Sequence, residues 1–331
     1  MPKHFFGPLA ALLALTLFTA CMPAAGAQIK WGVNESGLEF GTGPIRGTNF
    51  VVPDPGYYLQ HGAQLIRVPF KLSRLQPVAG GLLDPAYVQD LQTIIAKDSA
   101  AGAITVLDPQ GFGFYDINGK PHDILADSPA AAGYLNMMTR IAETFGKENV
   151  AIGLMNEPHA GADTAYAALW NRAITAMRQA GYKGIILVPH AHWSNAGDIK
   201  PDKPYNGEIV DPENNWALEL HLYMDADSTG TYRKPVVSAE IGAQRLAGAI
   251  AWSKQTHIRI FLGETNAPAT PLGLAALRNT LGQITAAPDV FWGVALWGGG
   301  PWWKPDYPLR LDPINGKDQP QFTLLEQTFK Q

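Results

Sequence analysis

The chain has 331 residues, of which 46% are hydrophobic and 16% charged, a composition typical of a globular protein with a substantial core. Its net charge of −4 and the absence of any block of Lys and Arg exclude a basic surface for nucleic acid. The single cysteine, Cys21, excludes an internal disulfide, and its early position leaves the rest of the chain without a Cys nucleophile or a thiolate metal site.

Residues 1–27 have the features of an export signal. Lys3 and His4 form a short positive start, residues 9–17 an apolar stretch, and residues 25–27 a small-residue cleavage site. The run 18–21, Phe-Thr-Ala-Cys, also resembles a bacterial lipoprotein box, so cleavage before Cys21 with lipidation there is a second interpretation. We therefore expect a secreted or periplasmic protein, whose membrane attachment, if any, is a lipid anchor at Cys21.

After this segment, short apolar runs alternate with stretches of helical period. Eight runs bounded by turn residues predict strands at 30–33, 64–69, 104–108, 150–156, 184–189, 217–223, 259–264 and 291–297. Helical patterns lie at 84–101, 129–145, 163–180, 238–254 and 272–286, several with Pro or Asp near their starts. Alternating strands and helices indicate parallel pairing, and no Gly/Ser linker divides the chain. The pattern predicts an α/β fold, a single (β/α)8 TIM barrel over residues 28–331.

Polar side chains end successive predicted strands, and this is the end of such a barrel where active sites lie. They are Arg67, Asp108, Asn156, Glu157, His190, His192, His221, Tyr223, Glu264 and Trp297. Glu157 in Asn-Glu-Pro and Glu264 in Gly-Glu-Thr each stand where an apolar run gives way to a loop. A carboxyl group held there is rigid and partly desolvated, and cleavage of a glycosidic bond requires two such groups facing each other. The two glutamates therefore predict an enzyme.

Several motifs resemble glycoside hydrolase family 5, the retaining cellulase-type barrels, over residues 31–329. The matching segments are Gly32-Val33-Asn34 with 37–41, then 66–70, Asn156-Glu157-Pro158, 221–223 and Gly263-Glu264. Residues 225–231 and 297–303 resemble the endo-β-1,4-glucanases of that family in particular. The resemblance implies hydrolysis of β-1,4-glucosidic bonds in cellulose or related β-glucans, with no cofactor and no metal. We expect a monomer.

The resemblance also implies a role for each of four side chains around the bond that is cleaved. Glu157 would be the general acid/base and Glu264 the nucleophile that forms a glycosyl-enzyme, with their carboxyl groups ~5–5.5 Å apart. Arg67 would hold Glu264 ionised by a charge-assisted hydrogen bond. Tyr223 would donate a hydrogen bond to the same carboxylate and orient it.

Other side chains are implied to bind the sugar or to assist the proton donor. Asn156 would hydrogen-bond the 2-hydroxyl of the sugar, and His221 would assist proton cycling at Glu157. Trp297 would form the floor on which the sugar at the cleavage point stacks. Further candidate platforms for glucose rings are Trp193, Trp302 and Trp303.

One position departs from the family pattern. After the third strand the family usually has Asp-Pro-His-Asn-Tyr, whereas residues 108–112 read Asp-Pro-Gln-Gly-Phe. Gln110 can donate to and accept from a sugar hydroxyl, but it cannot carry a proton or a charge. The rate, the pH profile and the substrate therefore stay open, while both carboxylates of the reaction are present.

Three alternatives stay open from the residues alone. The same barrel could act on another β-glycan, as a mannanase or a mixed-linkage glucanase, because loop shape decides between these polymers. His190-Ala191-His192 follows the fifth predicted strand in a metal-ligand pattern found in amidohydrolases, with His221 as a further candidate ligand. The replacement at Gln110 also allows a carbohydrate-binding protein without turnover, although the two retained glutamates argue against it.

Overall fold

The computed structural model describes residues 28–330, so the predicted export signal and Cys21 lie outside the described residues. Eight parallel strands form a closed barrel in the order β1-β10-β9-β8-β7-β6-β3-β2. Their bounds are β1 Lys30–Glu35, β2 Leu65–Lys71, β3 Ile104–Gln110, β6 Val150–Gly153, β7 Ile186–Pro189, β8 Trp216–Tyr223, β9 Ile260–Asn266 and β10 Phe291–Gly299. Each corresponds to one predicted strand, and the prediction of a single (β/α)8 barrel is confirmed.

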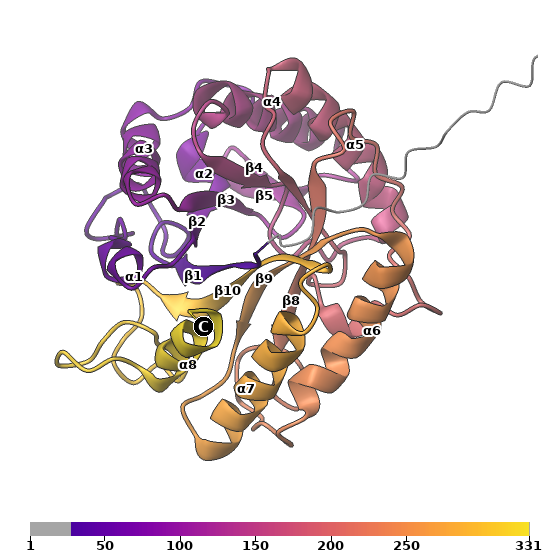
Figure 1. Cartoon of the computed structure of the whole chain (residues 1–331). Coiled ribbons are helices and arrows are strands. Elements are labelled where there is room, and N and C mark those ends of the chain that lie inside the picture. The colour runs from indigo at the N-terminus through magenta and orange to yellow at the C-terminus, as the bar shows by residue number, and fades with distance from the viewer. Residues whose placement is uncertain (1–27, 331) are drawn as a thin grey trace, which may run out of the picture.

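The longer helices surround the strands, as Figure 1 shows. They are α3 Pro85–Ala100, α4 Ser128–Phe145, α5 Asp163–Gln179, α6 Ile241–Thr256, α7 Pro271–Thr285 and α8 Pro320–Phe329. The first five match predicted helices, and α8 was not predicted. Asp84, Asp127 and Thr270 each accept a hydrogen bond from a first-turn backbone N–H at the start of a helix, with proline close behind. No helix within residues 28–330 is long and apolar enough to cross a membrane.

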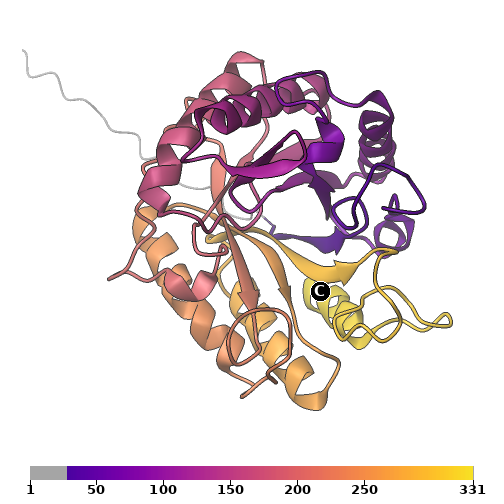
Figure 2. The same cartoon turned by 180° about the vertical axis from the view of Figure 1, so that it is seen from behind.

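Shorter elements occupy the loops. They are α1 Gly56–Gln60, α2 Leu72–Leu75, the 3-10 helix η1 Ala196–Asp198, and an antiparallel hairpin of β4 Phe114–Ile117 and β5 Lys120–Asp123. The hairpin was not predicted, because Lys-Pro-His-Asp of β5 lacks an alternating apolar pattern. In Figures 1 and 2, α1 lies beside α8, where the rings of Tyr58 and Phe322 are 5.0 Å apart. This contact joins the two ends of the barrel domain.

The barrel interior changes from apolar to polar along the strands. One level is filled by an apolar cluster of Leu65, Val106, Ala151, Leu187, Ala217, Phe261 and Ala295. Two residues further along three of these strands lie Arg67, Asp108 and Glu219, all buried. Because side chains alternate between the two faces of a strand, these polar groups point into the same interior. The apolar level therefore supports a polar level at the carboxyl ends of the strands, where barrel enzymes carry their active sites.

Candidate active site

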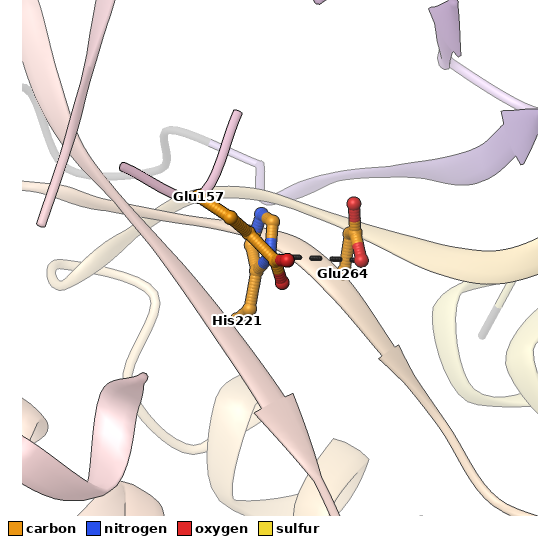
Figure 3. A group of neighbouring side chains, drawn as sticks. All are labelled: Glu157, His221 and Glu264. Carbon is orange, nitrogen blue, oxygen red and sulfur yellow. Dashed lines mark hydrogen bonds and ion pairs between the residues drawn. The ribbon is translucent and has the colours of Figure 1, made fainter. Parts of the chain in front are cut away.

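The two predicted glutamates meet at the carboxyl end of the barrel. Glu157 lies in the loop after β6, which ends at Gly153 and not at Asn156 as predicted; the chain bends from Leu154, and Glu157 itself has a φ of 44°. Glu264 lies within β9, and Figure 3 shows both carboxyl groups beside His221. One oxygen of each carboxyl group and one nitrogen of His221 lie within 4.8 Å of one another. This spacing fits a retaining pair (~5–5.5 Å) and is too short for an inverting pair (~6.5–9.5 Å).

A β-bulge aims Glu264 into the mouth of the barrel. His221 of β8 pairs with Glu264, and the register shifts just before this pair, so that β9 holds one extra residue, Gly263. Phe261 faces the interior, and strict alternation from there would point Glu264 outward. A side chain at Gly263 has no room, because its Cβ would lie 2.4 Å from Glu219 Oε1. Gly263 is therefore the extra residue of the bulge, and its missing side chain leaves room for Glu219.

Arg67 connects the polar groups of this level and is fully buried. Its guanidinium donates to Glu264 Oε1 at 2.9 Å, Glu219 Oε1 at 3.0 Å, Asn34 Oδ1 at 2.7 Å and Asn156 Oδ1 at 2.9 Å, and lies 3.0 Å from Asp108 Oδ1. Burial raises the pKa of Asp108 to about 7. Burial also acts to raise the pKa of Glu219, but the charges and hydrogen bonds of Arg67 and His221 together lower that pKa. One cation therefore holds the Glu264 carboxylate and the Asn156 amide in fixed orientations.

Glu219 is a site residue that the sequence analysis missed. It lies near the middle of β8, and its side chain is bound to Arg67 beneath the reacting groups. Glu219, His221 and Tyr223 alternate along a strand that is otherwise apolar, so they share the interior face. A charged residue inside a buried strand requires a partner, and this alternation was the signal that could have identified it.

The two carboxyl groups lie in different electrostatic surroundings. Glu264 is bound by Arg67 and by Tyr223, whose hydroxyl donates to Oε2 at 2.8 Å. Burial and the like charge of Glu264 raise the pKa of Glu157. Burial acts to lower the pKa of His221, but the carboxylates around it raise that pKa to about 10, and its Nδ1 lies 2.8 Å from Glu157 Oε1. The site therefore combines a carboxylate held by donors with a carboxyl group that keeps its proton more readily.

Gln110 stands at the end of β3 and bridges two polar groups. Its Nε2 donates to Asp108 Oδ2 at 2.7 Å, and Asn156 Nδ2 donates to its Oε1 at 3.0 Å. Asn156 Oδ1 also accepts from Arg67, so both the oxygen and the nitrogen of the Asn156 amide are held in place. The glutamine thus orients Asn156 without carrying a charge.

An aromatic cluster borders the carboxyl pair on the side of β10. Trp297 donates from Nε1 to the hydroxyl of Tyr307 at 3.2 Å, and Trp303 stacks on Tyr307 with ring centroids 4.0 Å apart. Trp302 stacks on Phe40 at 5.1 Å. Trp302, Trp303 and Tyr307 line a cavity of about 600 Å³. Three of the predicted sugar platforms therefore lie together, with Tyr307 as an aromatic neighbour that the sequence analysis did not single out.

Trp193 lies apart from this cluster, in the loop after β7. The residue is 49% exposed, and its ring stacks on the imidazole of His159 with ring centroids 3.7 Å apart. Together with Glu157 and His221 it lines a second cavity, of about 470 Å³. His192, Trp193 and Ser194 have consecutive φ values of 61°, 62° and 53°, a left-handed backbone that is costly for residues with a Cβ. Such strain is typical of functional sites, where surrounding structure holds a side chain in place.

The His190-Ala191-His192 motif does not assemble a metal site within the described residues. His190 Nδ1 lies 2.9 Å from both carboxylate oxygens of Asp163, and His192 is exposed. In residues 28–330 the three-residue group with metal-ligand spacing is Glu157, His221 and Glu264. A metal there would compete with Arg67 and with the proton on His221, because metal ligands must be deprotonated. These residues suit chemistry by two carboxyl groups better than the amidohydrolase alternative.

Known proteins resemble this chain in sequence and in fold. A family model described as Cellulase (glycosyl hydrolase family 5) matches residues 57–280. Endoglucanase gh5-1 of Neurospora crassa is 33% identical over 315 residues, which is 92% of this chain and 78% of that protein. The crystal structure of an endo-β-1,4-glucanase from Xanthomonas axonopodis pv. citri has a TM-score of 0.85 and 31% identity, over 91% of this chain and 98% of that one. A structure of XacCel5A in complex with cellopentaose has a TM-score of 0.83 and 30% identity, over 92% and 100%.

The agreement extends across most of the chain and does not depend on a single motif. The matched segment 57–280 includes β2 to β9 and therefore both glutamates. The fungal endoglucanase is more than 30% identical to this chain, and the alignment covers more than two thirds of both proteins. The chain therefore belongs to glycosyl hydrolase family 5, the cellulase family.

Proposed function

We propose that this chain is a retaining endo-β-1,4-glucanase that hydrolyses cellulose or related β-glucans by a two-glutamate double displacement. The observation that carries the proposal is the close approach of Glu157 and Glu264, within 4.8 Å, in contrasting electrostatic surroundings. The relatives described above are endoglucanases, and one was solved with cellopentaose, which supports a β-1,4-glucan over mannan or mixed-linkage glucan as the main substrate.

In the first displacement Glu264 attacks the anomeric carbon of the sugar at the cleavage point. Its oxygen forms a bond to that carbon while the glycosidic bond breaks, and Glu157 gives its proton to the departing oxygen. Arg67 and Tyr223 both donate to the Glu264 carboxylate and aim it before the attack. Asn156 donates to the 2-hydroxyl, a contact that tightens as positive charge develops on the sugar.

In the second displacement water replaces the enzyme on the same carbon. Glu157, now a carboxylate, takes a proton from the water, whose oxygen bonds to the anomeric carbon and releases Glu264. His221, 2.8 Å from Glu157, stabilises this anionic form between the two steps because it is cationic. Two inversions give net retention, so the first product is the β-anomer.

Internal cleavage is supported by room on two sides of the carboxyl pair. The cavity of about 470 Å³ at Glu157 and Trp193 and the cavity of about 600 Å³ at Trp302 and Trp303 lie in different loops of the barrel end. A glucan chain that stacks on aromatic rings in both regions extends past the cleavage point in both directions. Endo action requires this geometry.

The proposal predicts rapid loss of viscosity of carboxymethyl-cellulose with few new reducing ends, and initial release of the β-anomer by proton NMR. Mannan and xylan should be hydrolysed at least about tenfold more slowly, because an axial hydroxyl or a missing hydroxymethyl group loses contacts of about 1–2 kcal/mol. Activity should persist in EDTA. An initial α-anomer would contradict retention, and activity lost in EDTA and restored by zinc would support the amidohydrolase alternative.

We also infer export, from the pattern of residues 1–27. Mass spectrometry of the N-terminal peptide of the protein made in a bacterial host distinguishes two outcomes. A mature chain that starts at Gln28 indicates secretion or release into the periplasm, and one that starts at an acylated Cys21 indicates a lipid anchor in the envelope. A chain that keeps residues 1–27 would contradict export.

A further inference from the structure

Glu219 is a buried carboxylate beneath the reacting pair, and no step of the proposed mechanism uses it. It lies on β8, its side chain points into the barrel, and the residue is 1% exposed. Glu219 Oε1 accepts from Arg67 Nε at 3.0 Å and lies 2.9 Å from Arg67 Nη2 and 3.7 Å from His221 Nε2. Glu219 is therefore placed beside both cations of this level of the barrel.

Each of these cations reaches a different reacting carboxyl group through another of its nitrogens. Arg67 Nη1 donates to Glu264 Oε1 at 2.9 Å. His221 Nδ1 lies 2.8 Å from Glu157 Oε1. Glu219 is thus separated by a single cation from the nucleophile and by a single cation from the acid/base. A change in the charge of Glu219 acts on both groups.

Ion pairing alone does not explain why a carboxylate stands at this position. Arg67 already has Glu264 and Asp108 as partners at 2.9 and 3.0 Å. Glu219 Oε2 is buried without a hydrogen-bond partner among the described residues, and such an atom lowers stability. The fold nevertheless leaves room for this group, because a Cβ at Gly263 would lie 2.4 Å from Glu219 Oε1. A destabilising group that the fold accommodates in this way is typical of a functional site.

The charge of Glu264 changes during the reaction, whereas that of Glu219 does not. When Glu264 bonds to the sugar, its carboxylate becomes an ester and no longer neutralises Arg67. Burial acts to raise the pKa of Glu219, but the charges and hydrogen bonds of Arg67 and His221 lower it, so Glu219 stays an anion. Arg67 therefore keeps a counter-ion in the glycosyl-enzyme, and with it its place 2.9 Å from Asn156 Oδ1.

Glu219 also favours the protonated form of the pair Glu157 and His221. Burial acts to lower the pKa of His221, but Glu264, Glu157 and Glu219 raise it to about 10. The other titratable groups around the pair are Arg67, Asp108, Tyr223 and Tyr307, with His192 and Asp227 exposed at the mouth of the cavity. Without the negative charge of Glu219, the pair loses its first proton at a lower pH, whichever of the two residues releases it.

We propose that Glu219 is a positioning residue for hydrolysis: its carboxylate holds Arg67 and cationic His221 in place through both displacements and extends proton donation by Glu157 to higher pH. This inference rests on the proposed function, because it assumes that Glu157 and Glu264 are the acid/base and the nucleophile. Glu219 itself acts through the two cations and touches no reacting atom.

The test measures kcat/KM against pH for Glu219→Gln on carboxymethyl-cellulose and on dinitrophenyl cellobioside. The carboxamide has nearly the same shape as the carboxylate and removes its charge. On the polymer, whose leaving group needs a proton, the alkaline limb of the profile should move down by about one pH unit. The aryl glycoside departs without a proton, so its profile should show no such shift. A merely structural role would not separate the two substrates.

Glu219→Asp keeps the charge but draws it back from both cations by one methylene. Its alkaline limb should stay within about 0.3 pH unit of the native one, while kcat on both substrates falls at least about tenfold, because Arg67 is less firmly held. Asp211→Asn is the matched control, since Asp211 is the buried carboxylate partner of Arg178 and lies away from the site. It should lower stability and keep the native pH profile and kcat.

Folded Glu219→Gln with the native alkaline limb on the polymer would overturn the inference and leave the proposed function intact. Native kcat in Glu219→Asp would overturn it as well, and this variant decides the question if Glu219→Gln does not fold. The same shift of the limb in Asp211→Asn would assign the effect to lost stability and also overturn it. A native enzyme that cleaves neither substrate would remove the proposed function and this inference with it.

Discussion

Glu264→Gln is expected to abolish hydrolysis of every glycoside, whereas Glu157→Gln should keep a fast first step on an aryl cellobioside with an acidic phenol. The carboxamide of a glutamine cannot form the glycosyl-enzyme, so loss of Glu264 should lower kcat by at least about 10⁴-fold on any substrate. A leaving group that departs without protonation does not need Glu157. On carboxymethyl-cellulose, which does need it, Glu157→Gln should lower kcat by about 10²–10⁴-fold.

The measurement is stopped-flow release of dinitrophenol from its cellobioside, alongside reducing-sugar assays on the polymer. Glu157→Gln should show a burst of phenol followed by slow turnover, because the base of the second step is missing, and added azide should speed that turnover. Glu264→Gln should show neither the burst nor the azide effect. Glu143→Gln, on the exposed side of α4, is the matched control and should behave as the native enzyme. A burst from Glu264→Gln would assign the nucleophile to another group.

Arg67→Met is expected to cost both stability and catalysis. Arg67 is fully buried between Glu264, Glu219 and Asp108 at 2.9–3.0 Å, and its loss leaves carboxylates without their cation. Removing one partner of a buried ion pair typically costs ~3–5 kcal/mol, which is a large part of the ~5–15 kcal/mol that stabilises a domain. The folded fraction should also lose kcat, because the guanidinium no longer holds and aims the Glu264 carboxylate.

The control separates these two effects. Arg178 is also buried and donates from Nε and Nη2 to the two oxygens of Asp211 at 2.8 and 2.7 Å, but it lies on α5, away from the carboxyl pair. Arg178→Met should lower the free energy of unfolding in urea by a similar amount and leave kcat per folded molecule unchanged. Arg67→Met should lower both quantities. Native kcat in folded Arg67→Met would refute the positioning role of this arginine.

Much of the fold could be predicted because its signals are local. The apolar run 104–108 lies inside β3 Ile104–Gln110, and Asp84 before Pro85 marks where α3 begins. The β4–β5 hairpin escaped prediction, since its strands are short and one is polar throughout. The predicted strand 150–156 was too long, because it was drawn from the apolar run alone: β6 ends at Gly153, the chain bends from Leu154, and Glu157 turns just before Pro158.

The sequence identified most residues of the candidate site but few of the contacts between them. Glu157, Glu264 and Arg67 could be selected because charged groups at the ends of apolar strands have few structural explanations. The extra residue Gly263, which turns Glu264 inward, could not be selected, because a bulge exists only relative to the registers of β8 and β10. The role of Gln110 as a bridge between Asp108 and Asn156 likewise required the end of β3 and the loop after β6 to be in place.

The sequence by itself determined the alternation of strands and helices, the absence of thiol chemistry after Cys21 and the identity of the two carboxyl groups, because periodicity and residue type are properties of neighbouring positions. Only the tertiary structure decided which groups touch. Arg67 meets Glu219 from 152 positions away and Glu264 from 197, and His221, from a third strand, lies beside Glu157. Closing the barrel sets these distances, since strand register and loop packing depend on residues far apart in the chain.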